Sequence, residues 1–300
     1  MAAPARHLRR NRRSHGRAVI TTREKMAMAR VLQLPVLVAR RVARRGPEVD
    51  TRRRGLTWHL DLREGIDFSI WLRGCFEPST IAAYRRELTP GATVVDVGAN
   101  MGAHTLEFAR AVGPEGKVLA CEPTAYVFAR LLANLEANPE LRPRVRADQV
   151  MLMAQLEASL PAELVASWPL GTDPERDRTS WGHAYPTTGA RISTLDHWVA
   201  DQRVDRVDLI KLDVEGNECA VLDGALEVLS RHRPVIVCEV FAQALMSQGW
   251  TVDDLLERFS AAGYRLETLR GRPVTRSALT RLERRGASTN VVARHREPRS

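Results

Sequence analysis

The chain has 300 residues, of which 44% are hydrophobic, and it carries a formal net charge of +9 at neutral pH. This composition is typical of a globular protein and excludes a disordered chain, and the length allows one large domain or two small ones. A charge of this size suggests a nucleic-acid or anionic partner, but it is concentrated at one end of the chain.

The basic residues gather near the start of the sequence. Residues 1–55 contain 16 Lys or Arg and three acidic residues, whereas residues 56–280 contain 23 basic and 31 acidic ones. We therefore expect 1–55 to form a flexible Arg-rich leader and 56–300 to form the folded domain. Contact with a nucleic acid or an anionic surface would then run through the leader alone. An organelle transit peptide is the other interpretation of this segment.

The leader contains no transmembrane segment. Its apolar stretch at 26–40 is interrupted by Arg30 and Pro35 and is shorter than the ~20 residues that a membrane span needs. The four cysteines show no CxxC spacing, so we expect unpaired thiols in the core and neither a disulfide framework nor a metal site. Free thiols favour a reducing compartment, which predicts a cytoplasmic location. They are Cys75, Cys121, Cys219 and Cys238.

Ordered structure is expected to begin with residues 56–74, whose alternating pattern suggests a short hairpin. Beyond Thr93, strands alternate with helical patterns, which predicts a doubly wound, mainly parallel seven-stranded α/β sheet. Two further strands would pair as an antiparallel hairpin at one edge, and the segment at about 150–190 is rich in loops. The five parallel strands are expected at 93–97, 117–121, 144–150, 207–213 and 234–239, and the edge strands at 263–269 and 288–294.

The first strand leads into the sequence "VVDVGANMGAHT" at 94–105. Its glycines allow backbone N–H groups to approach a ligand closely, but the spacing differs from the GxGxxG of dinucleotide-binding loops. Asp96 would repel a phosphate and would suit the ammonium group of an amino acid-like cofactor. A simple strand-to-helix turn, with Asp96 as a local cap, is the alternative.

The second strand ends at Glu122, 24 residues beyond Gly98. A carboxylate at this place can accept hydrogen bonds from both hydroxyls of a ribose. Enzymes that use nicotinamide cofactors share this feature, so alone it is weak. Together with the first turn it indicates a cofactor that carries adenosine.

The fourth strand ends in "LIKLDVEGNE" at 209–218, where charged residues enter an otherwise apolar stretch. Such charges cost free energy unless they are paired or functional. Lys211 and Asp213 share one face of the strand, and Glu215 follows them. Catalysis, a structural Lys–Asp pair, and Mg²⁺ bound by the carboxylates all remain possible, although no metal is expected.

These segments together resemble the FkbM-type methyltransferases, members of the S-adenosylmethionine-dependent Rossmann-like class. The resemblance runs from about Leu56 to Arg294. It rests on "GCFEP", "VVDVGANMGAHT", "CEPTAYVFARLLANLEAN", "STLDHW", "VDLIKLDVEGNECAVLDGALEVLSRHRPVIVCEV" and "TNVVA". The chain departs from the family pattern in the Arg-rich leader and in the segment between the third and fourth strands.

The resemblance implies a cofactor and an acceptor. Asp96, Gly98, Asn100 and Gly102 would surround the methionine and ribose parts of S-adenosylmethionine, with Glu122 on the ribose hydroxyls and Asp148 or Gln149 facing the adenine. The acceptor would be a small molecule or glycan, methylated on a hydroxyl of a sugar, glycan or natural product.

For proton removal, Asp213 is the leading candidate and Glu215 the second, while Lys211 would keep Asp213 ionised. His183 lies in a loop that would cover the pocket. Trp168, Trp181 and Tyr185 would stack on a sugar or serve only in packing. Two other functions stay open: a nicotinamide-dependent oxidoreductase, and a non-catalytic binding protein that uses its basic leader.

Overall fold

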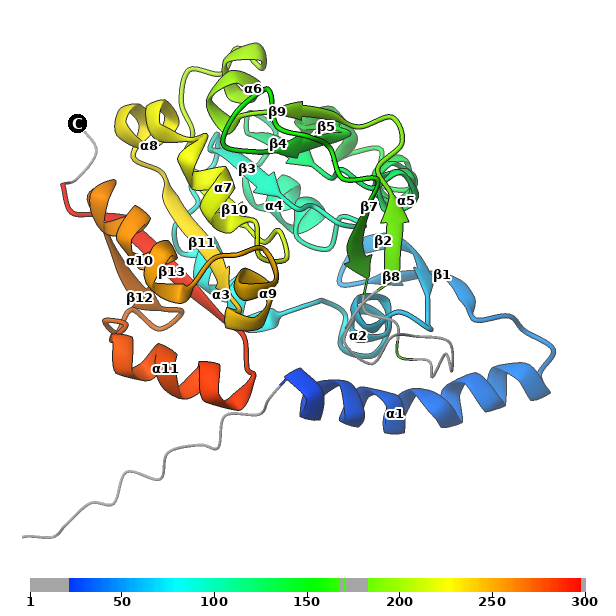
Figure 1. Cartoon of the computed structure of the whole chain (residues 1–300). Coiled ribbons are helices and arrows are strands. Elements are labelled where there is room, and N and C mark those ends of the chain that lie inside the picture. Colours follow the sequence, from blue (N-terminus) through cyan, green and yellow to red (C-terminus); the bar gives the residue numbers. More distant parts are fainter. Residues whose placement is uncertain (1–21, 168–169, 171–182, 298–300) are drawn as a thin grey trace, which may run out of the picture.

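The computed structural model describes residues 22–167, 170 and 183–297. Seven strands form the central sheet, in the order β12-β13-β11-β10-β3-β4-β5, which runs from the lower left to the upper right of Figure 1. The five strands from β11 to β5 are parallel, and β13 is antiparallel to both of its neighbours. Their bounds are β3 Thr93–Val97, β4 Lys117–Cys121, β5 Val145–Asp148, β10 Leu209–Leu212, β11 Val235–Val240, β12 Tyr264–Thr268 and β13 Thr289–His295.

Helices cover both faces of this sheet because side chains alternate along each strand. Val94 and Val118 belong to one apolar core, and their neighbours Val95 and Leu119 belong to the other. The first core includes side chains of α2 (Gly65–Arg73), α3 (Pro78–Arg85), α4 (Thr105–Ala111) and α5 (Ala125–Glu136). The second includes side chains of α6 (Leu195–Asp201), α7 (Glu218–Asp223), α8 (Leu226–His232), α9 (Ala242–Ser247), α10 (Val252–Ala261) and α11 (Arg276–Arg285). The doubly wound sheet expected from the sequence is confirmed.

The two edge strands are also confirmed, but they do not form a tight hairpin. Helix α11 lies between them in the chain, and β13 inserts between β11 and β12. The four cysteines are buried and unpaired, as expected.

The loop-rich segment contains two small strand pairs. Strand β6 (Val150–Leu152) pairs in parallel with β9 (Arg191–Ser193), and β7 (Glu163–Ser167) pairs antiparallel with β8 (His183–Pro186). Trp168 and Trp181 lie outside the described residues, so the structure says nothing of their suggested stacking.

The boundary expected at residue 56 is wrong. Helix α1 spans Thr22–Val42, and β1 (Glu48–Arg53) pairs along its whole length with β2 (Leu56–Asp61). The hairpin therefore lies one strand earlier than expected, and residues 65–73 form α2 instead. Its turn uses Arg54 and Gly55, both with positive φ, as two-residue hairpins require.

The Arg-rich sequence on both sides of β1 hid its alternating pattern. Val49 packs against the core, whereas the neighbouring Glu48 and Asp50 are exposed. Arg53 is half-buried, and its Nε donates to the backbone carbonyl of Trp71 (2.8 Å). None of the described helices, α1 included, is both long enough and apolar enough to cross a membrane.

We expect a chain that begins at residue 56 to be less stable than one that begins at residue 46. Both lack α1, but only the shorter one loses the β1–β2 pairing and the burial of Val49. The loss should be about 1 to 3 kcal/mol in the free energy of unfolding, measured by urea denaturation. Equal stabilities would show that β1 adds nothing and would restore 56 as the boundary.

Candidate active site

The loop after β3 lies against the loop after β10. Gly98 has φ +79°, and a Cβ at this position would stand 1.9 Å from the backbone carbonyl oxygen of Asp213. Only glycine permits both this φ and this approach. The close contact occurs at the carboxyl ends of neighbouring parallel strands, where the strand order reverses and where ligands bind in such sheets.

Asn100 connects this loop to two others. Its backbone N–H donates to Glu122 Oε2 (3.2 Å), and its Nδ2 donates to the carbonyl of Ala166 in β7 (2.6 Å). Its φ of +49° is one that asparagine tolerates better than most residues. Asn100 therefore links β7 to the loop after β3.

Glu122 is buried and oriented by three donors. Its Oε1 accepts from the backbone N–H (2.9 Å) and the hydroxyl (2.6 Å) of Thr124, and its Oε2 accepts from Asn100. Burial raises the pKa of Glu122, and the hydrogen bonds from Thr124 and Asn100 oppose that rise. The carboxylate is thus held in one orientation.

A cavity of about 740 Å³ lies over these loops. Its walls come from the loops after β3, β4, β10 and β11, from β6 and β7, and from α9. Five residues expected at the site line it: Gly98, Asn100, Glu122, Asp213 and Glu215.

Asp96 and Gly102 do not line this cavity. Asp96 is buried behind the loop, where its Oδ2 accepts from the hydroxyl of Thr105 at the start of α4 (2.6 Å). Gly102 permits close packing, because a Cβ there would stand 2.9 Å from Leu131 Cδ1. Both residues shape the loop from behind, and their place around the cofactor stays a prediction.

Asp148 and Gln149 are also directed elsewhere. Asp148 Oδ2 accepts from Trp198 Nε1 (2.8 Å) and from Gln202 Nε2 (3.0 Å), on the α6 side of the sheet. Gln149 Nε2 donates to the backbone carbonyls of Pro123 (3.1 Å) and Thr188 (2.9 Å). The cavity wall at this end is formed instead by residues 150–152 of β6.

Lys211 is fully buried below the cavity and does not line it. Its Nζ donates to Asp213 Oδ2 (2.6 Å), while the Asp213 side chain remains 26% exposed and reaches the cavity. Burial acts to lower the pKa of the Lys211 ammonium, but the charges of Asp213 and Glu77 outweigh it and raise that pKa. Lys211 therefore remains a cation and holds Asp213 in place.

The sequence interpretation assigned no role to Glu77, which lines the cavity just before α3. Its Oε2 accepts from Asn290 Nδ2 (2.9 Å) and lies 3.6 Å from His104 Nε2. Burial acts to raise the pKa of Glu77, but His104 and Lys211 outweigh it and lower that pKa to about 2. Two of the family motifs in the sequence contain Glu77 and its partner Asn290, since Glu77 lies in "GCFEP" and Asn290 in "TNVVA".

Glu239, at the end of β11, is a second residue without an expected role. It lines the cavity, and burial together with the charges of Asp213 and Glu215 raises its pKa well above the ordinary value. Six acidic residues thus line one cavity: Glu77, Glu122, Glu163, Asp213, Glu215 and Glu239. The described residues contain no group of three or more His, Cys, Asp or Glu arranged to hold a metal ion.

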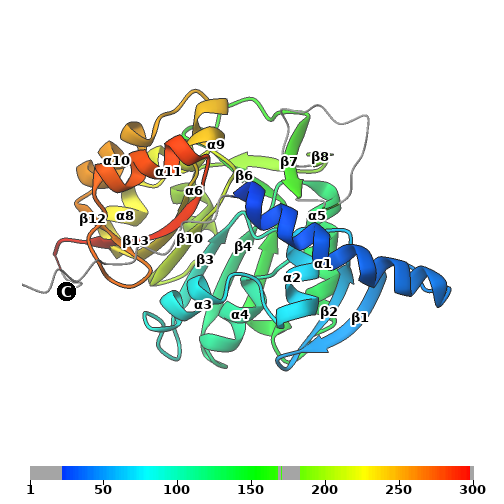
Figure 2. The same cartoon turned by 90° about the horizontal axis from the view of Figure 1, so that it is seen from below.

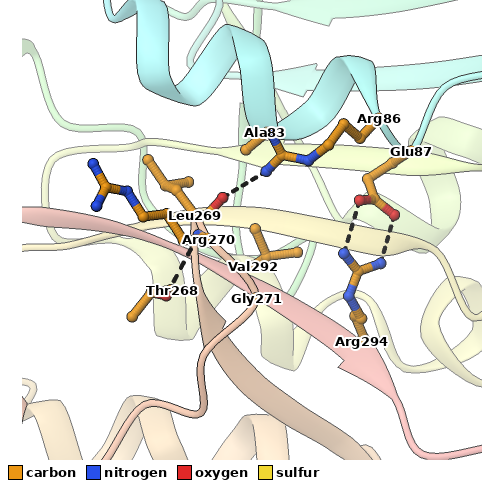
Figure 3. A pocket seen from close by; sticks show the side chains of 9 residues that line it. All are labelled: Ala83, Arg86, Glu87, Thr268, Leu269, Arg270, Gly271, Val292 and Arg294. Atoms are coloured by element: carbon orange, nitrogen blue, oxygen red, sulfur yellow. Dashed lines mark hydrogen bonds and ion pairs between the residues drawn. The ribbon is translucent and has the colours of Figure 1, made fainter.

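A smaller cavity, of about 340 Å³, lies between α3 and the loop after β12 (Figure 3). Its charged groups are largely engaged with one another. Arg294 forms a two-pronged ion pair with Glu87 (2.5 and 2.7 Å), and Arg86 donates to the carbonyl of Leu269 (2.6 Å). None of the residues predicted at the site lies there, so we assign the functional site to the larger cavity.

Residues 96–266 match the family model of the methyltransferase FkbM domain. The chain belongs to the FkbM family of S-adenosylmethionine-dependent methyltransferases. The resemblance seen in the sequence motifs is confirmed, and the oxidoreductase and the non-catalytic binding protein are set aside. No curated protein sequence matches the chain.

Solved structures show similarity to this FkbM methyltransferase at low sequence identity. The FkbM methyltransferase from Methylobacillus flagellatus matches with a TM-score of 0.40 and 13% identity, over 75% of this chain and 57% of that one. TYW2 from M. jannaschii, solved in complex with AdoMet, matches with a TM-score of 0.41 and 14% identity, over 83% of this chain and 85% of that one. A putative transferase from Pyrococcus horikoshii matches with a TM-score of 0.45 and 15% identity, over 87% of this chain and 81% of that one.

His183 and Tyr185, which the sequence suggested for the substrate side, lie in β8 of this methyltransferase. Tyr185 stacks on Tyr126 of α5, with ring centroids 4.7 Å apart and planes at 18°. His183 lies near Tyr185, with ring centroids 6.1 Å apart. Neither lines the cavity. Tyr185 packs against Tyr126, and the covering role suggested for the loop of His183 stays a prediction.

The contact between the two loops can be tested by Gly98→Ala, with Gly91→Ala as the matched control. Both glycines have φ near +80°, but a Cβ at Gly91 meets nothing within 4 Å. The control should lose about 1 to 2 kcal/mol of stability from φ alone, whereas Gly98→Ala should lose several kcal/mol more through overlap with Asp213. Urea denaturation measures both, and equal losses would contradict the close approach.

Proposed function

We propose that this FkbM methyltransferase methylates a hydroxyl group of a sugar, glycan or natural product, with Asp213 as the general base. One observation carries the proposal. A single cavity is lined by Gly98, Asn100 and Glu122 from the β3–β4 side and by Asp213 from β10.

The residues present fit S-adenosylmethionine. The cavity volume of about 740 Å³ lies in the ordinary range for small-molecule sites, roughly 300 to 1,000 Å³. Apolar side chains at 150–152 and Pro123 suit an adenine ring at one end. The Glu122 carboxylate would accept hydrogen bonds from the ribose hydroxyls, and the acidic lining suits a ligand with an ammonium and a sulfonium.

S-Adenosylmethionine, when bound, supplies a methyl group on a positively charged sulfur. The protein must then hold an acceptor oxygen in line with that methyl group, and such alignment can supply about 7 to 11 kcal/mol of the barrier at best. Asp213 Oδ2 accepts a hydrogen bond from Lys211 Nζ. We therefore assign the other oxygen, Oδ1, to the acceptor hydroxyl, and Oδ1 takes up the proton of that hydroxyl. Glu215, two residues further on in the same loop, is the second candidate for that proton.

Lys211 serves as a positioning residue in this proposal. It is 1% exposed and lies behind Asp213, so it does not reach the acceptor. Its hydrogen bond to Oδ2 fixes the orientation of the Asp213 carboxylate.

N-methylation of an amine is a second candidate, and the acidic lining of the cavity favours it. An acceptor that arrives as an ammonium would be attracted by this lining. Matched hydroxyl and amino acceptors, such as glucosides and the corresponding 2-amino sugars, separate the two reactions when the labelled methyl group is traced to oxygen or nitrogen.

Replacing Glu122 with Ala should weaken the binding of S-adenosylhomocysteine at least about tenfold, because charge-assisted hydrogen bonds contribute roughly 1.5 to 3 kcal/mol each. The matched control is Thr124→Val, which removes a hydroxyl that orients Glu122 but keeps the carboxylate. The affinity of Thr124→Val for S-adenosylhomocysteine should fall less than that of Glu122→Ala. Isothermal titration calorimetry measures both, and unchanged affinity of a folded Glu122→Ala protein would reject the ribose assignment.

Asp213→Asn should bind S-adenosylhomocysteine nearly as the natural protein does but lose turnover by roughly 10² to 10⁴, because the amide keeps the shape and loses the basicity. Methyl transfer is measured with labelled donor on a panel of glycosides. Glu215→Gln is the matched control, and its turnover should fall less than that of Asp213→Asn. A stable and fully active Asp213→Asn would remove Asp213 from the mechanism.

A purely structural role for Asp213 gives a different result. In either role the substitution removes the carboxylate that pairs with the buried Lys211 ammonium, so the melting temperature falls. In a purely structural role, activity would fall only as far as the folded fraction falls, whereas in a catalytic role the folded protein itself would be inactive. Measuring both on one preparation distinguishes the two roles.

A further inference from the structure

The apolar contacts that the described part of helix α1 makes with the rest of the protein lie on one side. Ala29, Val36 and Leu37 pack against the core that includes α2. Gln33 is buried on the same side, and its Nε2 donates to the carbonyl of Leu62 (2.6 Å). At 3.6 residues per turn, these positions share one face of the helix.

The opposite face of α1 is apolar and exposed. It forms a stripe roughly 120° wide along the helix, and the exposed fractions of its large side chains run from 51% to 80%. In Figure 1, α1 lies along the lower edge of the molecule, beside α2, and in Figure 2, which is seen from below, it lies in front of the other elements. The large side chains of this outer stripe are Met28, Val31, Leu32, Val38 and Val42.

Basic residues accompany the outer stripe. Arg30 and Arg41 are exposed on the flank of α1, and Arg44 and Arg45 are exposed just beyond its end. The preceding residues 1–21 contribute six further arginines and no acidic residue to the sequence. An apolar stripe beside concentrated positive charge is typical of helices that lie in the interface of a membrane.

Charge decides among the partners that could cover this face. A nucleic acid would pair with the arginines but would leave the apolar stripe in water. A second copy would bury the stripe but would bring two sets of arginines together. A bilayer with anionic lipid satisfies both features, since polybasic segments are attracted to its surface and apolar side chains enter the acyl–headgroup boundary.

We propose that the outer stripe of α1 docks this protein on the surface of a bilayer that contains anionic lipid. Helix α2, against which α1 packs, contributes Ile66 to the wall of the larger cavity. Docking would therefore hold that cavity close to the membrane. The proposal rests on the surface of α1 and stands apart from the choice of methyl acceptor.

Co-sedimentation of the full chain with vesicles tests the docking. We expect binding to phosphatidylcholine vesicles that contain about one-third phosphatidylglycerol, and little binding to phosphatidylcholine alone. The double substitution Val31→Asp with Val38→Asp should weaken binding roughly tenfold or more, because charges cannot enter the apolar boundary. The matched control is Leu226→Asp in α8, where the side chain is equally exposed, and it should bind as the natural protein does.

If the double variant binds as tightly as the natural chain, the arginines alone carry the attraction and the docking of the outer stripe is refuted. Absence of binding to the anionic vesicles also refutes it. So does a dimer in sedimentation velocity that the double variant dissociates, provided that the vesicles are not bound.

A second measurement does not depend on disruptive substitutions. The four native cysteines are buried, so Val38→Cys can be labelled selectively with an environment-sensitive fluorophore. Its emission should shift to the blue on anionic vesicles, whereas the same label at Leu226→Cys should not respond. An unchanged emission at Val38→Cys in a protein that sediments with the vesicles would show that the stripe does not enter the bilayer.

Discussion

The buried ammonium of Lys211 is the constraint on which the site depends. A cation in the middle of a parallel sheet is tolerated only if opposite charges surround it, and here Asp213 and Glu77 supply them. These two carboxylates come from the loop after β10 and from the residue before α3. One buried charge therefore holds together segments that are distant in the sequence.

Backbone packing complements this electrostatic arrangement. Gly98 brings the loop after β3 against the carbonyl of Asp213, and Asn100 connects the same loop to Glu122 and to β7. The contact between Gly98 and Asp213 thus joins the two sides of the cavity. One side suits the cofactor, and the other carries Asp213. This is the arrangement that alignment-based catalysis requires, since small displacements of reacting groups cost large factors in rate.

The chain divides its charge between two surfaces with different roles. The larger cavity is lined by acidic residues, whereas residues 1–55, which include α1, carry 16 basic residues and three acidic ones. The overall positive charge therefore says nothing of the cavity, whose own potential is of the opposite sign. An acidic cavity beside a basic docking face would keep an anionic surface and a cationic ligand at separate places.

The sequence by itself determined the sheet and the part of the site formed by strand ends. Runs of β-branched residues mark the strands, and the carboxyl ends of parallel strands must meet, so Gly98, Glu122 and Asp213 could be placed together without coordinates. The family motifs also pointed to "GCFEP" and "TNVVA", although no role followed for Glu77 or Asn290 until the structure brought them into contact.

Only the tertiary structure decided where the remaining side chains point. Asp96 turns to Thr105 and Asp148 to Trp198, because the direction of a side chain at a strand end depends on which helix packs beside it. The pairing of β1 was likewise hidden, since the Arg-rich composition of the segment resembles that of a solvated tail. Local patterns record the propensity of a segment, whereas its partner is selected by packing and charge between residues far apart in the chain.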